Sequence, residues 1–364
     1  MYFDYAATSI KRKNIILNLM ENFEEYNGNP SSIHSLGKKS KIHLEQARKK
    51  IAEYIGANSK NIIFTSGATE SNNMIVNNFN DKDIEIITTN IEHKSILEPL
   101  NASNAKVIYL KASQNGQINI EDLKNAITKK TKLVSVMYVN NETGVIQPIE
   151  EISKLLKDTD IWFHVDAVQA LGHIDIDVEE LNVDSMSFSG HKVGALNGLG
   201  VLYTKNKLKN LIYGGIQESG RRAGTSNTIS AVSMANSLGE MDYEREDVSN
   251  IQKYFLKRLE EIPYEINGDI EKIINHIVNI YFPWAKSDLL LTYLDLNGIY
   301  VSAGSACNAN TLEKSYVIEN MYDSERAEHS IRFSFGFTNT KEEIDKLIVK
   351  LKEIYIRKSW YERK

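Results

Sequence analysis

The chain has 364 residues, of which 42% are apolar and 25% charged, values that are ordinary for a globular protein. The formal net charge is −5, which excludes the broad basic face of a protein that binds nucleic acid non-specifically. No run is apolar for long enough to cross a bilayer, and the N-terminal residues lack the pattern of a signal peptide. We therefore expect a cytoplasmic protein without membrane or direct nucleic-acid contacts.

Short apolar runs alternate with helix-like segments along the first two-thirds of the chain. The runs predict strands at 61–65, 84–88, 106–110, 133–139, 162–165, 185–189 and 200–204. The segments between several of these strands predict helices at 41–55, 92–100, 120–128 and 149–157. Alternation at this spacing indicates an α/β fold, with a mostly parallel seven-stranded sheet covered by helices on both faces.

The last third of the chain has a different character. A charged helix is predicted at 241–262, directly before Pro263, and shorter strand and helix patterns follow it. We interpret this region as a smaller α+β domain. The predicted division gives a large domain at 13–245 and a small domain made of 1–12 and 246–364.

A first candidate site is the turn at 65–70, Thr-Ser-Gly-Ala-Thr-Glu, where a strand ends and a helix can begin. Free backbone N–H groups and the positive end of the helix dipole would face one point there. That arrangement binds phosphate groups. For the motif alone, a plain helix N-cap is the more common explanation.

Two further candidates follow later strands of the same predicted sheet. Asp166 comes directly after the strand at 162–165, and Lys192 follows the strand at 185–189. A carboxylate at this edge can hold a protonated ring nitrogen, and a lysine can form a Schiff base with an aldehyde cofactor. Each residue alone is better explained as a helix cap or a solvated lysine. Together with the phosphate-binding turn, they predict that Lys192 holds pyridoxal phosphate.

The chain resembles the cysteine desulfurases of the NifS and IscS kind, within the aminotransferase class V group of fold-type I pyridoxal phosphate enzymes. Ordered motifs carry this resemblance almost from end to end. They are DYAAT at 4–8, GNPSSIH at 28–34, SGATES at 66–71, EHK at 92–94, VNNETG at 139–144, HVDA at 164–167, SFSGHK at 187–192, RAGT at 222–225, GSAC at 304–307 and SIRFS at 330–334.

The resemblance implies a role for each residue around the cofactor ring. Lys192 would form the Schiff base and later move the proton on the substrate Cα. Asp166 would pair with the pyridinium nitrogen, and Gln169 would reach the ring hydroxyl. His93 would stack on the ring and shuttle protons.

The resemblance also implies how the two anionic groups are held. Asn141 would lie at the cofactor and, with Arg332, would hold the substrate carboxylate, which the fork-shaped guanidinium suits. No metal is expected. A homodimer is expected, because one phosphate ligand would come from the neighbouring subunit. The phosphate ligands would be Ala68, Thr69, Ser189 and His191, joined by Thr225 across the interface.

Cys307 is the single cysteine of the chain and lies in a run of small and polar residues at 301–310. Such a run lacks the apolar side chains that pack firmly, so we expect a mobile loop. An exposed thiol can ionise and attack, whereas a small buried residue would be passive. We favour the reactive interpretation.

By resemblance, the enzyme would convert L-cysteine to L-alanine. Cys307 would take the substrate sulfur as a persulfide and pass it to an acceptor protein. Iron–sulfur cluster assembly, tRNA thiolation and thiamine synthesis all remain open as destinations. The segment at 304–316 is not shortened, which favours the NifS/IscS-like branch.

Several positions depart from the family pattern. The lysine is followed by VGALNG at 193–198, without the aromatic residue, proline and second lysine that are often found there. The element GGIQESGR at 214–221 lacks the third glycine of the family pattern. Past the cysteine, Asn308 and Asn310 replace smaller residues, and Lys314 replaces a proline. None of these changes removes a chemical group from the predicted site.

Two classes of alternative function remain. A selenocysteine lyase, an aminotransferase or an epimerase of the same group would share the amine chemistry, and Cys307 would be incidental in the last two. A non-catalytic scaffold that docks sulfur-trafficking proteins would not need the amine chemistry. The joint presence of Lys192, Asp166, Cys307 and Arg332 argues against a scaffold.

Overall fold

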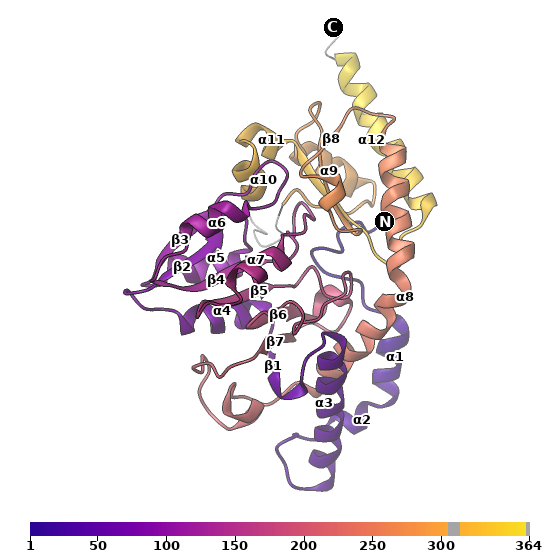
Figure 1. Cartoon of the computed structure of the whole chain (residues 1–364). Helices are drawn as coiled ribbons and strands as arrows, with labels where there is room; N and C mark the ends of the chain where they lie inside the picture. Colours follow the sequence, from indigo (N-terminus) through magenta and orange to yellow (C-terminus); the bar gives the residue numbers. More distant parts are fainter. Residues whose placement is uncertain (305–313, 362–364) are drawn as a thin grey trace.

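The computed structural model describes residues 1–304 and 314–361. A seven-stranded sheet forms the centre of its larger part, with the strand order β1-β7-β6-β5-β4-β2-β3 (Figure 1). β7 pairs antiparallel with β1 and β6, and the other neighbours pair in parallel, which confirms the predicted α/β fold. The strands are β1 (Ile62–Thr65), β2 (Glu85–Thr89), β3 (Lys106–Leu110), β4 (Thr131–Met137), β5 (Trp162–Asp166), β6 (Ser185–Ser189) and β7 (Gly200–Thr204).

Helices cover both faces of this sheet, because successive strand residues point to opposite sides. Ile62 packs in one buried cluster with α3, α6, α7 and α8, whereas Ile63 packs in another with α4 and α5. α1 and α2 lie beside α8. These helices are α1 (Lys13–Glu21), α2 (Phe23–Tyr26), α3 (Ser35–Tyr54), α4 (Ala68–Asn78), α5 (Lys94–Asn101), α6 (Ile120–Ala126), α7 (Ile149–Leu156) and α8 (Thr228–Leu259).

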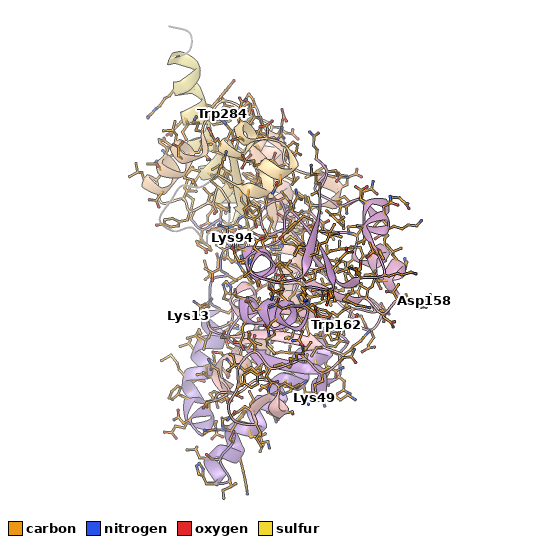
Figure 2. The ribbon with its side chains drawn as sticks, turned by 90° about the vertical axis from the view of Figure 1, so that its left-hand side faces the viewer. Lys13, Lys49, Lys94, Asp158, Trp162 and Trp284 are labelled. Carbon is orange, nitrogen blue, oxygen red and sulfur yellow. The ribbon has the colours of Figure 1, made fainter. Side chains whose placement is uncertain are left out.

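A second, antiparallel sheet with the order β10-β9-β8 lies in the C-terminal third. It packs against its own apolar cluster, which includes Phe255, Ile280, Phe333 and Leu347. Figure 2 shows Trp284 in this part and Trp162 in the larger one. The elements are β8 (Glu265–Ile266), β9 (Ile277–Tyr281), α9 (Ser287–Leu296), α10 (Tyr316–Met321), α11 (Ser324–Glu328), β10 (Ser330–Ser334) and α12 (Lys341–Tyr361).

Four short 3₁₀ turns complete the chain as far as it is described. They are η1 (Ser59–Asn61), η2 (Gly190–Val193), η3 (Gln217–Gly220) and η4 (Ile270–Lys272). None of the helices in the described ranges is both long and apolar enough to span a membrane.

The long helix α8 runs along the side of the molecule from the large sheet to the small one (Figure 1). The predicted helix at 241–262 covers only its second half, so the predicted start is wrong. Small residues such as Ser230 and Ala235 are buried in the first half, and this hides the 3.6-residue period of apolar side chains. The actual start of α8 carries a common capping residue, Asn227, whose side chain accepts a hydrogen bond from the Ser230 N–H.

The predicted domain boundary at 245 lies inside this unbroken helix. Buried residues of α8 up to Met241 belong to the cluster of the large sheet, and those from Val248 onward belong to the cluster of the small sheet. Phe3 also packs in the small-sheet cluster. The division into two domains stays a prediction.

Two other helix starts were predicted incorrectly. α3 begins at Ser35 rather than at 41, because His34 caps it by accepting the Gly37 N–H. α5 begins at Lys94 rather than at 92, because His93 caps it by accepting the Ser95 N–H. In both cases a histidine occupies the cap position, which Ser, Thr, Asp and Asn fill more often.

Candidate active site

A cavity of about 290 Å³ lies at the carboxyl ends of β1, β5 and β6, where α/β sheets bind ligands. Ten of the twelve predicted site residues line it. Thr225 does not, and Cys307 lies outside the described residues. The ten are Ala68, Thr69, His93, Asn141, Asp166, Gln169, Ser189, His191, Lys192 and Arg332.

The phosphate-binding turn is formed as the start of α4 at Ala68. The first N–H groups of a helix have no partner within it, so those of this turn can serve a ligand. β7 must begin with a glycine, because a Cβ on Gly200 would lie 2.3 Å from the carbonyl carbon of Gly67. Glu70 caps the turn by accepting the Ser66 N–H at 2.8 Å and pairs with Arg222. Burial acts to raise the pKa of Glu70, but these two hydrogen bonds outweigh it and lower that pKa.

A chain of buried hydrogen bonds orients Asp166. Asn72 donates from Nδ2 to Asp166 Oδ2 at 2.7 Å, and its Oδ1 lies 3.1 Å from His164 Nε2. On the far side of that ring, His164 Nδ1 lies 2.9 Å from Ser185 Oγ, which accepts the indole N–H of Trp162. Burial lowers the pKa of His164 to about 3, so the ring is neutral at neutral pH. Each donor in this chain therefore points towards Asp166, and the hydrogen bond from Asn72 fixes the orientation of its carboxylate.

The same asparagine also reaches His93. Asn72 Nδ2 donates to Ser95 Oγ at 2.8 Å, and Ser95 Oγ lies 2.8 Å from His93 Nδ1. His93 Nδ1 accepts the Ser95 N–H at 3.1 Å, so the neutral ring carries its proton on Nε2. Burial and the charges of Lys192 and Lys94 lower the pKa of His93, against the opposing charge of Asp166.

The amine of Lys192 is held by the N-terminal segment of the chain. Lys192 Nζ donates to Ala6 O at 2.5 Å and to Ala7 O at 2.8 Å. Gln169 Nε2 donates to the same Ala6 O at 2.9 Å. His191 Nδ1 lies 3.2 Å from Thr8 Oγ1, and burial and the neighbouring charge of Lys192 lower its pKa to about 3. Residues 4–8 therefore form one wall of the site.

The unusual residues after the lysine form a tight turn. Gly194 has φ +81°, and a Cβ there would lie 2.3 Å from Arg12 Nη1. Arg12 Nη1 donates to Val193 O at 2.7 Å, and the Leu196 N–H donates to Ser233 Oγ. The segment 193–198 thus keeps Lys192 in place without the proline of the common pattern.

Arg332 lies in the middle of β10 and is only 1% exposed. Its Nη1 donates to Asn141 O at 2.7 Å, and its Nη2 donates to Asp4 Oδ1 at 2.7 Å. Arg332 Nε and Asn141 Oδ1 are buried and have no hydrogen-bond partner within the described ranges. A buried donor and acceptor left open beside a cavity are what a polar ligand would satisfy.

The residues that flank the segment containing Cys307 contact Arg332 on one side and Glu142 on the other. Ser302 pairs with Arg332 across an antiparallel bridge, with the Arg332 N–H donating to Ser302 O at 2.6 Å. After the segment, Ser315 Oγ donates to the carboxylate of Glu142, the residue after Asn141. Both flanks of the predicted sulfur-carrying segment are therefore held near Arg332 and Asn141, on the side of the cavity where the substrate carboxylate is predicted to bind.

Thr225 is exposed on the connection between β7 and α8. This connection is held to β1 by Glu218, which accepts the Phe64 N–H at 3.0 Å and a hydrogen bond from Arg48. Glu218 and Ser219 have φ of 47° and 58°, a region that L-residues adopt rarely. The unusual element at 214–221 is thus stabilised by the buried ion pair of Arg48 and Glu218, and Thr225 stays a prediction for an interface.

Three residues of the site were not singled out from the sequence. Asn72 and Ser95 hold Asp166 and His93, and Asp4 pairs with Arg332. Asp4 opens one of the resembling motifs, so its position offered a signal, although not a partner. Asn72 and Ser95 follow their motifs within helices and carried no signal of their own.

Comparison with known proteins gives concordant results. A family model described as Aminotransferase class-V matches residues 1–347. The protein named cysteine desulfurase IscS from Dictyoglomus turgidum is 40% identical over 361 residues, which covers 95% of this chain and 92% of that protein.

Two solved structures show the same agreement in three dimensions. A structure named NifS-like protein is 33% identical with a TM-score of 0.90, covering 98% of this chain and 99% of that one. A structure named SspA in complex with cysteine is 32% identical with a TM-score of 0.82, covering 93% and 99%.

Proposed function

The chain belongs to the aminotransferase class-V family, and we propose that it is a pyridoxal 5′-phosphate-dependent cysteine desulfurase. It takes L-cysteine, leaves L-alanine and carries the sulfur on Cys307. The observation that carries the proposal is the meeting of Lys192, Asp166 and Arg332 on one cavity. Relatives named cysteine desulfurase match this chain over almost its full length.

The residues present at the ring end fit pyridoxal phosphate. The start of α4 offers backbone N–H groups to the phosphate, and the buried carboxylate of Asp166 suits a protonated ring nitrogen. When bound, this cofactor supplies an aldehyde that captures amines and a cationic ring that stabilises negative charge at the substrate Cα. Asn72 and His164 keep Asp166 aimed at the ring position.

Lys192 moves the proton at the substrate Cα. As an uncharged amine it accepts that proton at Nζ, and the carbonyl oxygens of Ala6 and Ala7 then stabilise the resulting ammonium. His93 stays neutral, because its pKa is lowered, and presents a proton at Nε2. It therefore acts as a hydrogen-bond donor on the ring face.

The substrate carboxylate binds to Arg332 and Asn141, where no residue of the described ranges satisfies Arg332 Nε. The thiolate of Cys307 attacks the substrate sulfur. An S–S bond forms as the C–S bond breaks, the electron pair stays on the substrate Cβ, and Cβ takes up one proton, equivalent to the one that the Cys307 thiol lost on ionising, to give L-alanine. The persulfide then passes to a thiol of an acceptor protein, a partner that stays a prediction, as does the cytoplasmic location.

Exposed apolar residues support a homodimer. Ile33 and Ile216 are each 89% exposed and line the same surface pocket, and Tyr213, which is 80% exposed, lies with Ile216 on the connection that leads to Thr225. Large apolar side chains gathered on one surface mark an interface. A second subunit covering this loop would bring Thr225 to the neighbouring phosphate.

The single cysteine permits a sharp test. After incubation with ³⁵S-labelled L-cysteine, the wild-type protein is expected to carry a persulfide that alkylating reagents trap on Cys307. Cys307→Ala is expected to keep the yellow cofactor and to lose sulfur release by at least about a hundredfold. Full-rate sulfur release by this thiol-free variant would refute the mechanism.

A second measurement separates catalysis from scaffolding. Borohydride reduction of the wild-type protein is expected to fix the cofactor to Lys192, and Lys192→Ala should show no such adduct. Absence of a reducible Schiff base in the wild-type protein would favour a non-catalytic scaffold.

A further inference from the structure

Arg332 is already paired before any substrate arrives. Asp4 Oδ1 accepts from Nη2 at 2.7 Å, while Nη1 is engaged by Asn141 O. Arg332 is 1% exposed, and the Asp4 side chain is 19% exposed. A guanidinium has five N–H groups, so further donors remain for a ligand, with Nε among them. The positive charge of Arg332, however, is already paired with the carboxylate of Asp4.

Asp4 cannot easily move away from this position. Its neighbour Phe3 accepts the Ser334 N–H at 2.8 Å, and the Ala6 N–H donates to Ser334 Oγ at 2.9 Å. Asp4 itself bridges to Ser334, two residues beyond Arg332 on β10. The backbone on both sides of Asp4 is therefore tied to the strand that carries Arg332, and the two side chains are held in a fixed register.

This arrangement has two opposite effects on a carboxylate ligand. The hydrogen bond from Arg332 to Asp4 fixes the guanidinium plane, which favours binding because little side-chain freedom is lost. The negative charge of Asp4 repels a second carboxylate at the same guanidinium, which opposes binding. Substrate and product share their α-carboxylate, so the repulsion weakens both equally and speeds release of the product.

We propose that Asp4 is a positioning residue, which orients Arg332 and at the same time limits the affinity of the site for amino-acid carboxylates. The proposal rests on the proposed function, because it takes Arg332 as the carboxylate ligand. It predicts that the charge and the hydrogen bond of Asp4 have effects of opposite sign.

Asp4→Asn separates the two effects, because the amide oxygen keeps the acceptor and loses the charge. In the purified holoenzyme, we expect the KM for L-cysteine to fall roughly three- to tenfold, without a rise in kcat. Calorimetric titration with L-alanine should show a Kd lower by the same factor. The control Asp175→Asn neutralises a carboxylate that pairs with Arg245 on the surface, and it should change neither value.

A higher or unchanged Kd for L-alanine in Asp4→Asn would overturn the proposal, since Asp4 would then only hold the arginine in place. The titration does not depend on sulfur chemistry. If the wild-type protein binds L-alanine but releases no sulfur, the proposed function fails while the test of Asp4 still stands. If neither protein binds L-alanine, the carboxylate site itself is refuted.

Discussion

The two ends of the cavity are built in different ways. At the ring end, Asp166 closes β5, and Lys192 follows β6 by three residues, so neighbouring strands of one sheet deliver both groups. At the carboxylate end, Arg332 comes from the second sheet, and its partner Asp4 is 328 residues away in the chain. The first pair is therefore placed by successive strands of one sheet, although the N-terminal segment also holds Lys192 through Ala6 and Ala7. The second pair exists only where the N-terminal segment meets β10.

This difference has a consequence for what each end tolerates. The ring end is supported by a buried network in which each polar group has a defined direction, from Trp162 to Asp166. The carboxylate end keeps a buried donor on Arg332 and an acceptor on Asn141 that no described residue satisfies. We therefore expect ring-end changes to alter turnover and carboxylate-end changes to alter affinity.

The largest expected effect is at the carboxylate end. Arg332→Lys replaces a planar fork by a single ammonium, which cannot serve Asn141 O, Asp4 and a substrate carboxylate together. We expect the KM for L-cysteine to rise roughly 10- to 100-fold, with a much smaller change in kcat. Steady-state kinetics at saturating cofactor measures this.

The matched control is Arg326→Lys in α11, which pairs with Glu265 and does not line the cavity. Its KM should stay within a factor of two or so of the wild-type value. A fall in kcat with an unchanged KM for Arg332→Lys would mean that the two ends do not divide their tasks as described.

A smaller effect is expected from Asn72→Ala at the ring end. The change removes the donor to Asp166 and leaves the His164 Nε2 proton unpaired in a buried position. We expect kcat to fall about tenfold and the pH at which the cofactor absorbance changes to shift, because Asp166 is less well fixed.

Asn73→Ala in the same helix is the control, since the hydrogen bond from Asn73 to Thr69 O lies on the exposed side of that helix. It should leave the absorbance titration unchanged. An unshifted absorbance titration in Asn72→Ala would show that the hydrogen bond from Asn72 is not needed to orient Asp166.

The smallest expected effect is on thermal stability, at the buried residue Glu92. Glu92 is fully buried, and burial, with the charge of Asp166, raises its pKa from 4.5 to about 8. Between these pH values the unfolded chain is ionised at Glu92 and the folded chain is not, so folding takes up a proton and stability falls as pH rises. Glu92→Gln keeps an acceptor for the Met137 N–H and removes this cost.

Thermal unfolding should therefore show Glu92→Gln more stable than wild type by a few degrees, on the order of 3 °C, at pH 7.5 and equal to it near pH 4.5. Glu85 offers a control of opposite sign, because its hydrogen bond with Lys106 lowers its pKa. Glu85→Gln should lower the melting temperature at pH 7.5. Equal behaviour of the two variants would contradict a neutral Glu92.

Much of the fold was predictable because its strands follow simple patterns. The strands at 106–110, 185–189 and 200–204 have the predicted bounds. The first and last are short, mainly apolar runs, and the strand at 185–189 alternates serine with Met186 and Phe188. Helix starts were harder. α8 begins thirteen residues before the predicted start, because small buried side chains replace the apolar period there.

The site divides in the same way. Asp166 and Lys192 could be placed at one sheet edge from their position after strands alone. Strand alternation alone would place Arg332 on a polar face, whereas in the structure it is buried and paired with Asp4, a partner that alternation cannot reveal. His93 caps α5, which the predicted helix at 92–100 missed, and it also lines the cavity.

The sequence by itself determined the order of chemistry along the chain: a phosphate-binding turn, an acid, a lysine, a cysteine and an arginine, together with a family resemblance that the comparisons confirm. The tertiary structure decided which groups hold them. Asn72 supports Asp166, the carbonyls of Ala6 and Ala7 hold Lys192, and Asp4 shares Arg332. Such partners depend on contacts between distant segments, and local sequence patterns carry no information about a contact that only the packed fold creates.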